Sequence, residues 1–166
     1  MNDIQQLLLL ATPSRKLAVP LQNVVRVLPL AAWQPVPETP EWFLGLLNLA
    51  GEGLPILDLS LRLGLGEPGS YSIETPIVVI EAAEKRAGLV LQEVLGVQSV
   101  QTGGLQRTDL FAESNQPFLG LFQTREGELT LVLDPIRILD IVLTEMTPTD
   151  GVDAQLISQL ELEAGT

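Results

Sequence analysis

The chain has 166 residues, 46% of them hydrophobic, which suits one medium domain or two small lobes with real cores. Nine basic against 21 acidic residues give a formal net charge of −12, which makes nucleic acid and anionic membranes poor partners. The absence of cysteine and histidine excludes disulfides, the usual transition-metal ligands and histidine-activated nucleophiles. We expect no cofactor, no metal and a cytoplasmic location.

The N-terminal segments Ile4–Ala11 and Leu17–Leu21 are apolar and flank a polar turn, so they predict a β-hairpin. The run Leu7–Leu10 is too short to span a membrane and no small-residue cleavage site follows it. Apolar residues then recur at helical offsets over Gln22–Leu28, and Pro29 follows them. We therefore predict a helix of one or two turns over Gln22–Leu28.

The stretch Gly45–Asp58 is the centre of the sequence pattern. Two apolar runs flank a Gly51-Glu52-Gly53 tip, where glycine can adopt the positive φ of a tight hairpin. Asp58 precedes the short apolar segment Leu59–Leu63, so its carboxylate is placed to cap a helical turn. Before this stretch, the three prolines of segment 31–40 favour an extended crossing segment.

The second half of the chain repeats the first. At an offset of 70, segment 15–22 aligns with segment 85–92, and at an offset of 76 Ile56-Leu57-Asp58 aligns with Val132-Leu133-Asp134. The repeat predicts a mainly β fold of two similar β-barrel lobes with short helices. We expect one lobe at about residues 17–66 and the other at about 76–142. The N-terminal strand 4–11 belongs to one lobe or the other.

Beyond a domain at residues 1–144, we expect an acidic tail at 145–166. Its apolar stripe Leu156, Ile157 and Leu160 predicts a terminal helix.

Two patterns resemble enzyme sites. Gly64-x-Gly66-x-x-Gly69 formally matches a dinucleotide fingerprint, but Pro68 interrupts it and no helix N-terminus follows. Asp58 and Asp134 hold equivalent places in the two halves, as in an aspartic protease dyad, yet each precedes a helical turn and Pro135 suits a first helical position. We predict two helix caps and no catalytic residues.

The pattern Pro40-x-Trp42-x-x-Gly45-x-x-Asn48-Leu-Ala50-Gly-x-x-x-Pro-x-x-Asp-Leu resembles the signature of CheW-like domains, the bacterial chemotaxis coupling proteins. The resemblance covers roughly residues 4 to 142. It implies two five-stranded, SH3-like β-barrels and a non-enzymatic adaptor between the cytoplasmic tips of chemoreceptors and the regulatory domain of a CheA-type histidine kinase. One residue departs from the pattern, because Ala50 stands where the family has arginine.

Matching the family pattern residue by residue gives two candidate surfaces. The resemblance assigns Val24, Arg26, Gly45 and Asn48 to receptor binding, and Leu49, Ala50, Gly51 and Gly53 to kinase binding. The alternative function is a sensor that binds a small molecule or peptide in the cleft between the lobes. An open apolar groove favours the adaptor, and an enclosed pocket of several hundred Å³ with convergent polar groups favours the sensor.

Overall fold

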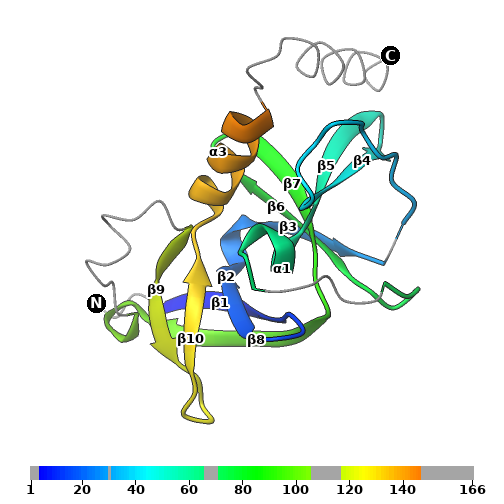
Figure 1. Ribbon diagram of the computed structural model, residues 1–166. Coiled ribbons are helices and arrows are strands. Elements are labelled where there is room, and N and C mark those ends of the chain that lie inside the picture. Colours follow the sequence, from blue (N-terminus) through cyan, green and yellow to red (C-terminus); the bar gives the residue numbers. More distant parts are fainter. Residues whose placement is uncertain (1–3, 30, 66–70, 106–116, 147–166) are drawn as a thin grey trace.

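The computed structural model describes residues 4–29, 31–65, 71–105 and 117–146. The expected tail at 145–166 lies outside them except for its first two residues, which belong to the helix that ends at Met146. It contains two five-stranded β-sheets (Figure 1). The first, which we name the terminal lobe, is made of β1 (Ile4–Ala11), β2 (Lys16–Pro20), β8 (Glu93–Gln101), β9 (Phe118–Gln123) and β10 (Leu129–Leu133). The second, the central lobe, is made of β3 (Val24–Leu28), β4 (Phe43–Leu49), β5 (Glu52–Asp58), β6 (Ile77–Ala82) and β7 (Lys85–Val90).

The two lobes have the same architecture, which confirms the prediction of a mainly β fold with two SH3-like lobes. The strand order is β8-β1-β2-β10-β9 in the terminal lobe and β3-β6-β7-β5-β4 in the central lobe. In each lobe the middle strand is paired antiparallel on one side and parallel on the other, with β10 beside β2 and β5 beside β7. The internal repeat is therefore present in the strand topology.

The boundaries that we expected for the lobes do not hold, because the halves exchange strands. The terminal lobe takes β1 and β2 from the first half and β8, β9 and β10 from the second, and the central lobe takes the remaining strands. Chain direction explains the exchange. Both β2 and β8 run antiparallel to β1, so a β3 strand in the place of β8 would run parallel to β2 in the same sheet. A connection between parallel strands needs a dozen or more residues. Only the 3₁₀ turn η1 (Leu21–Asn23) joins β2 to β3, so the chain enters the other lobe.

Residues of both lobes share one hydrophobic core. Leu10 and Leu17 of the terminal lobe and Ile80 and Leu89 of the central lobe are fully buried in the same cluster. Each lobe also has a smaller cluster of its own, around Phe122 in the terminal lobe and the buried side chains of β5 and β6 in the central lobe. The two lobes are thus packed as one body.

The helix α3 (Pro135–Met146) links the lobes a second time. It follows β10 of the terminal lobe but packs against β6 and β7 of the central lobe (Figure 1). Ile138 and Leu139 are buried in the shared core, and Lys85 Nζ lies 2.7 Å from Asp140 Oδ1. In the part of the chain that the structure describes, the other short helices are α1 (Leu59–Arg62), which follows β5, and the 3₁₀ turn η2 (Thr102–Gly104), which follows β8.

The prediction of a helix over Gln22–Leu28 is wrong. Apart from η1, this segment is the edge strand β3, paired antiparallel with β6. Its three valines are β-branched and stiff at χ1, which lowers helix propensity and favours a strand.

The central hairpin is confirmed, with a correction at its tip. Leu49 pairs with Glu52, so the turn is Ala50-Gly51, and Glu52 and Gly53 belong to β5. The positive φ values are those of Ala50, at 52°, and Gly51, at 89°.

Candidate functional site

The candidate kinase-binding residues gather at the tip of the β4–β5 hairpin. Ala50 is exposed at the turn, and Leu49 is half-buried against the central lobe's own core. The Oδ1 atom of Asn48 accepts a hydrogen bond of 3.0 Å from the Gly51 backbone N–H. This bond closes the two-residue turn with a local side-chain acceptor.

Charged side chains on neighbouring strands flank this tip. Arg86 on β7 places guanidinium nitrogens 3.4 Å from a Glu81 carboxylate oxygen and 4.0 Å from one of Glu52. We did not predict these residues as part of a site. Arg86 lies in the segment used to align the repeat, and we interpreted it and Glu81 as solvated charges at turns. Nothing local in the sequence places Arg86 beside the hairpin, because β5 and β7 pair in parallel from distant segments.

The four candidate receptor-binding residues do not lie on one strand. Val24 and Arg26 are on β3 and Gly45 and Asn48 on β4, which are the opposite edges of the central sheet. Arg26 and Asn48 are exposed, and Val24 is half-buried against the shared core.

Gly45 is buried and has a packing role. A Cβ atom at this position would lie 2.4 Å from the backbone oxygen of Gln34 in the crossing segment. Gln34 forms an isolated bridge with Leu46, with backbone hydrogen bonds of 2.8 and 2.9 Å. Gly45 therefore lets the crossing segment approach β4 closely.

A groove of about 910 Å³ lies between η1 and the start of α3, and none of the four receptor-binding candidates lines it. We name it the η1–α3 groove. Its apolar residues include Ile136, which is 52% exposed, and the half-buried Leu21 and Leu119. The full lining comprises Ile4, Gln5, Gln6, Pro20, Leu21, Gln22, Asn23, Leu105, Leu119, Asp134, Pro135 and Ile136. Sequence reasoning missed this groove because its walls come from five separate segments.

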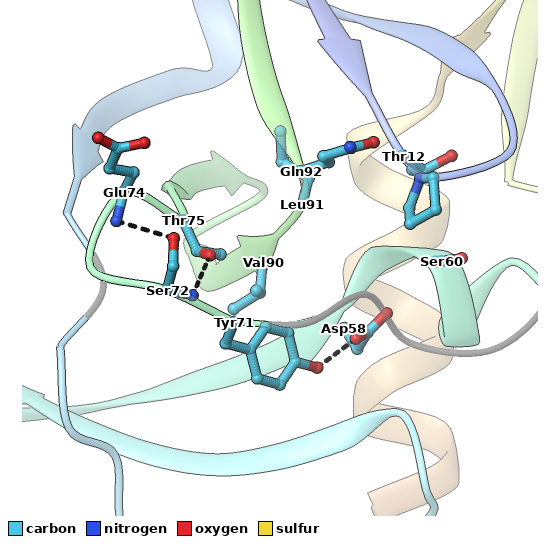
Figure 2. A pocket seen from close by; sticks show the side chains of 11 residues that line it. Thr12, Asp58, Ser60, Tyr71, Ser72, Glu74, Thr75, Val90, Leu91 and Gln92 are labelled. Atoms are coloured by element: carbon cyan, nitrogen blue, oxygen red, sulfur yellow. Dashed lines mark hydrogen bonds between the residues drawn. The ribbon is translucent and has the colours of Figure 1, made fainter.

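A second cavity, of about 430 Å³, lies at the junction of the lobes (Figure 2). We name it the junction pocket. Figure 2 shows the Tyr71 side chain beside it, with the hydroxyl group donating a hydrogen bond to Asp58 Oδ2. The lining comprises Thr12, Pro13, Asp58, Ser60, Tyr71, Ser72, Glu74, Thr75, Val90, Leu91 and Gln92. The pocket thus combines an apolar wall with several hydroxyl and carboxylate groups.

Both predicted helix caps are confirmed. Asp58 Oδ1 accepts a hydrogen bond of 3.0 Å from the Leu61 N–H. Asp134 Oδ1 accepts bonds of 3.0 Å from the Ile136 N–H and 3.4 Å from the Arg137 N–H. The two carboxylates thus stabilise the starts of α1 and α3.

The environment of Tyr71 favours its neutral form. Burial, followed by the hydrogen bond to Asp58 and the negative charge of that carboxylate, raises the pKa of Tyr71 above its ordinary value. The ring also packs edge-on against Trp33, with centroids 5.8 Å apart. The phenol is therefore a hydrogen-bond donor at neutral pH.

Within the described residues, no group of three or more acidic side chains is arranged to hold a metal ion. None of the helices in this part of the chain is both long and apolar enough to cross a membrane.

Comparison with known proteins agrees with the geometry. A model of the CheW-like domain matches residues 6–142. The chain is 27% identical over 138 residues to the chemotaxis protein CheW of Thermotoga maritima, covering 82% of this chain and 85% of that protein. It is 33% identical over 89 residues to a probable chemotaxis protein CheW of Rhizobium etli, covering 52% of this chain and 57% of that protein.

A solved structure shows the same fold. The scaffolding protein TtCheW of Thermoanaerobacter tengcongensis superposes with a TM-score of 0.70 at 22% identity, covering 80% of this chain and 89% of that chain. The family match spans both lobes, including their exchanged strands. The chain therefore belongs to the CheW-like domain family.

Proposed function

We propose that this chain is a non-enzymatic signalling adaptor that couples chemoreceptors to a CheA-type histidine kinase. It acts in the cytoplasm, in chemotaxis or a related motility-control pathway. The observation that carries this proposal is the family match over residues 6–142, which contain nearly all of the described fold. The two carboxylates that could have formed a catalytic dyad are engaged as helix caps, which supports a binding role.

The η1–α3 groove is the proposed receptor-docking surface. Its lining includes the apolar side chains of Leu21, Leu119 and Ile136 and the polar side chains of Gln5 and Gln22. A groove lined by both apolar and polar side chains suits an amphipathic helix, the mode in which helical segments dock on globular domains. Val24, which follows η1 directly, connects this groove with the receptor-binding candidates on β3.

The tip of the β4–β5 hairpin is the proposed kinase-docking surface. Ala50, Gly51 and Gly53 carry small side chains or none there, and the neighbouring Leu49 is half-buried, so a partner can approach the backbone closely. Arg86 and Glu52 lie beside the tip and offer both charge signs for pairing at the rim of an interface. The tip and the groove involve different segments, as an adaptor with two partners requires.

Two single substitutions separate these surfaces. Ile136→Glu places a charge in the apolar groove, while a carboxylate in the first turn of α3 is compatible with the helix dipole, so the fold is preserved. It should weaken binding of a purified receptor cytoplasmic fragment and leave the kinase regulatory domain bound. Ala50→Arg should change kinase affinity and leave receptor affinity unchanged.

The matched control is Ile73→Glu, which changes an isoleucine that is 88% exposed and lies outside the groove. Both affinities should be unchanged in this variant, measured by titration calorimetry. Equal receptor affinity in wild-type and Ile136→Glu proteins would contradict the proposed groove. Failure of the wild-type chain to bind either purified partner would contradict the proposed function.

A further inference from the structure

Two edge strands, one in each lobe, expose large apolar side chains. On β3 these are Val25 and Val27, and on β8 they are Leu95 and Val97. All four are between 38% and 50% exposed, and the internal repeat relates the two pairs at an offset of 70. Proteins usually cover or charge a hydrophobic strand at the edge of a sheet, because other segments can dock on it. Each edge is therefore a candidate surface for a further segment.

Charge distinguishes the two edges. Between its two valines β3 carries Arg26, which is exposed and forms no ion pair with any described carboxylate. At the equivalent position β8 has Gly96, and the only charged residue of β8 is Glu93. The edge of β3 thus combines a cation with apolar side chains in a chain whose net charge is −12. An acidic segment with an apolar face fits β3 and is disfavoured at β8.

The chain itself contains such a segment. Residues 147–166, which follow α3, include four acidic residues and no lysine or arginine. The helix predicted there places Leu156, Ile157 and Leu160 on one face. Asp153 precedes Leu156 by three positions and Ile157 by four, so it belongs to the same face. A carboxylate beside an apolar stripe complements the cation and the valines of β3.

The position of α3 puts this edge within reach. The helix packs against β6, and β6 is the strand that pairs with β3. The segment that follows α3 can span up to about 70 Å when extended, whereas neighbouring strands lie only about 5 Å apart. A tethered segment acts at an effective concentration of roughly millimolar, so weak contacts suffice to hold it on the surface.

We propose that segment 147–166 docks on the β3 edge of its own chain, with its apolar stripe against the two valines and Asp153 beside Arg26. Val24 and Arg26 are candidate receptor-binding residues, so a docked segment restricts the access of a receptor to this edge. This consequence rests on the proposed function and adds its regulation, whereas the docking itself does not depend on it. A segment docked in about nine of ten molecules lowers receptor affinity about tenfold.

The test places a spin label on segment 147–166, since the chain has no cysteine and a label attaches at one introduced position only. Ser158 lies outside the apolar stripe, so the full chain with Ser158→Cys carries the nitroxide. The label should broaden the backbone amide NMR signals of Val25 and Val27 more strongly than those of Leu95 and Val97. A mixture of spin-labelled chain with isotope-labelled chain lacking the nitroxide should show no such broadening.

Charge substitutions make the test specific. Arg26→Glu or Asp153→Arg alone should remove most of the broadening at β3, and Arg26→Asp combined with Asp153→Arg should restore it. The matched control is Arg125→Glu, which makes the same charge change at an exposed turn between β9 and β10 and should leave the broadening unchanged. Leu156→Asp interrupts the apolar stripe and should raise the affinity of a receptor cytoplasmic fragment by up to about tenfold, with kinase affinity unchanged.

Broadening at β3 that does not exceed that at β8, or that persists undiminished in both Arg26→Glu and Asp153→Arg, would overturn the docking. Broadening that appears only in the mixed sample would assign the surface to a second copy of the chain and overturn it as well. Unchanged receptor affinity in Leu156→Asp would overturn the regulatory consequence. Absence of receptor binding in every variant, with the broadening at β3 retained, would refute the adaptor function and leave the docking intact.

Discussion

Replacing Ala50 by glycine should stabilise the protein, because alanine at the hairpin tip is held in the left-handed region with φ of 52°. An L-residue there costs roughly 1–2 kcal/mol, and glycine does not carry this penalty. Glycine loses more backbone entropy on folding, roughly 0.5–1 kcal/mol. The net gain is therefore about 0–1.5 kcal/mol, which corresponds to a rise in Tm of up to about 6 °C for a chain of this size.

Thermal and urea unfolding of the two proteins measure this difference. The control is Ala32→Gly, since Ala32 is exposed and its φ is not positive. That substitution should lower stability by about 0.4–1 kcal/mol through the entropy of the unfolded chain. A lower Tm for Ala50→Gly, or the same sign for both substitutions, would show that the turn does not carry the strain we assign to it.

Four further predictions follow from particular contacts. Since the raised pKa of Tyr71 favours the neutral phenol in the folded state, its contribution to stability is fully present below about pH 10 and declines progressively as the pH rises above that value. The urea midpoint between about pH 8 and 11 should therefore fall less steeply in Tyr71→Phe. Alanine in place of Asp58 or Asp134 should cost about 1 kcal/mol of unfolding free energy, and kinase titrations should show unchanged affinity. Gly45→Ala should cost more than about 2 kcal/mol, because its Cβ would lie 2.4 Å from a backbone oxygen, and a smaller loss in urea unfolding would mean that the crossing segment moves away easily. Ala50→Arg should weaken the kinase complex by burying an unpaired charge if the partner has adapted to alanine, whereas tighter binding in calorimetry would show that the arginine-binding partner surface is retained.

Local features of the fold were predictable from the sequence. The hairpin at Gly45–Asp58 and the caps at Asp58 and Asp134 depend on residues close together in the chain, and all three are confirmed. The position of the turn was predicted wrongly, because the tip was expected at Gly51-Glu52-Gly53 and the structure has it at Ala50-Gly51. A two-residue turn needs positive φ at both central positions, and the sequence pattern favoured the glycines on either side of Glu52 over the alanine.

The exchange of strands between the halves was not predicted, although the sequence contains a signal for it. The repeat has the same strands in the same order whether or not they exchange, so alignment cannot distinguish the two arrangements. The length of the connection can, because segment 21–23 is too short for a parallel crossover within one sheet. Because Gln22–Leu28 was interpreted as a helix, the sequence interpretation contained no strand β3 and therefore no short connection from β2 to it.

The groove and the junction pocket could not be found from local patterns. Leu21, Leu119 and Ile136 come together only because α3 starts beside η1. In the same way, Thr12, Asp58 and Leu91 meet only at the junction of the two lobes. Cavities built from such distant segments depend on the topology, which the sequence repeat left undetermined.

The most direct test of the adaptor function is whether the chain joins two partners at once. A receptor cytoplasmic fragment and a kinase regulatory domain are mixed with and without this chain, and their masses are followed by sedimentation velocity. The groove and the hairpin tip are separate surfaces, so the account predicts a three-component complex that requires the chain and is lost with Ile136→Glu. Binding of the two partners that is mutually exclusive, or binding of neither, would contradict it.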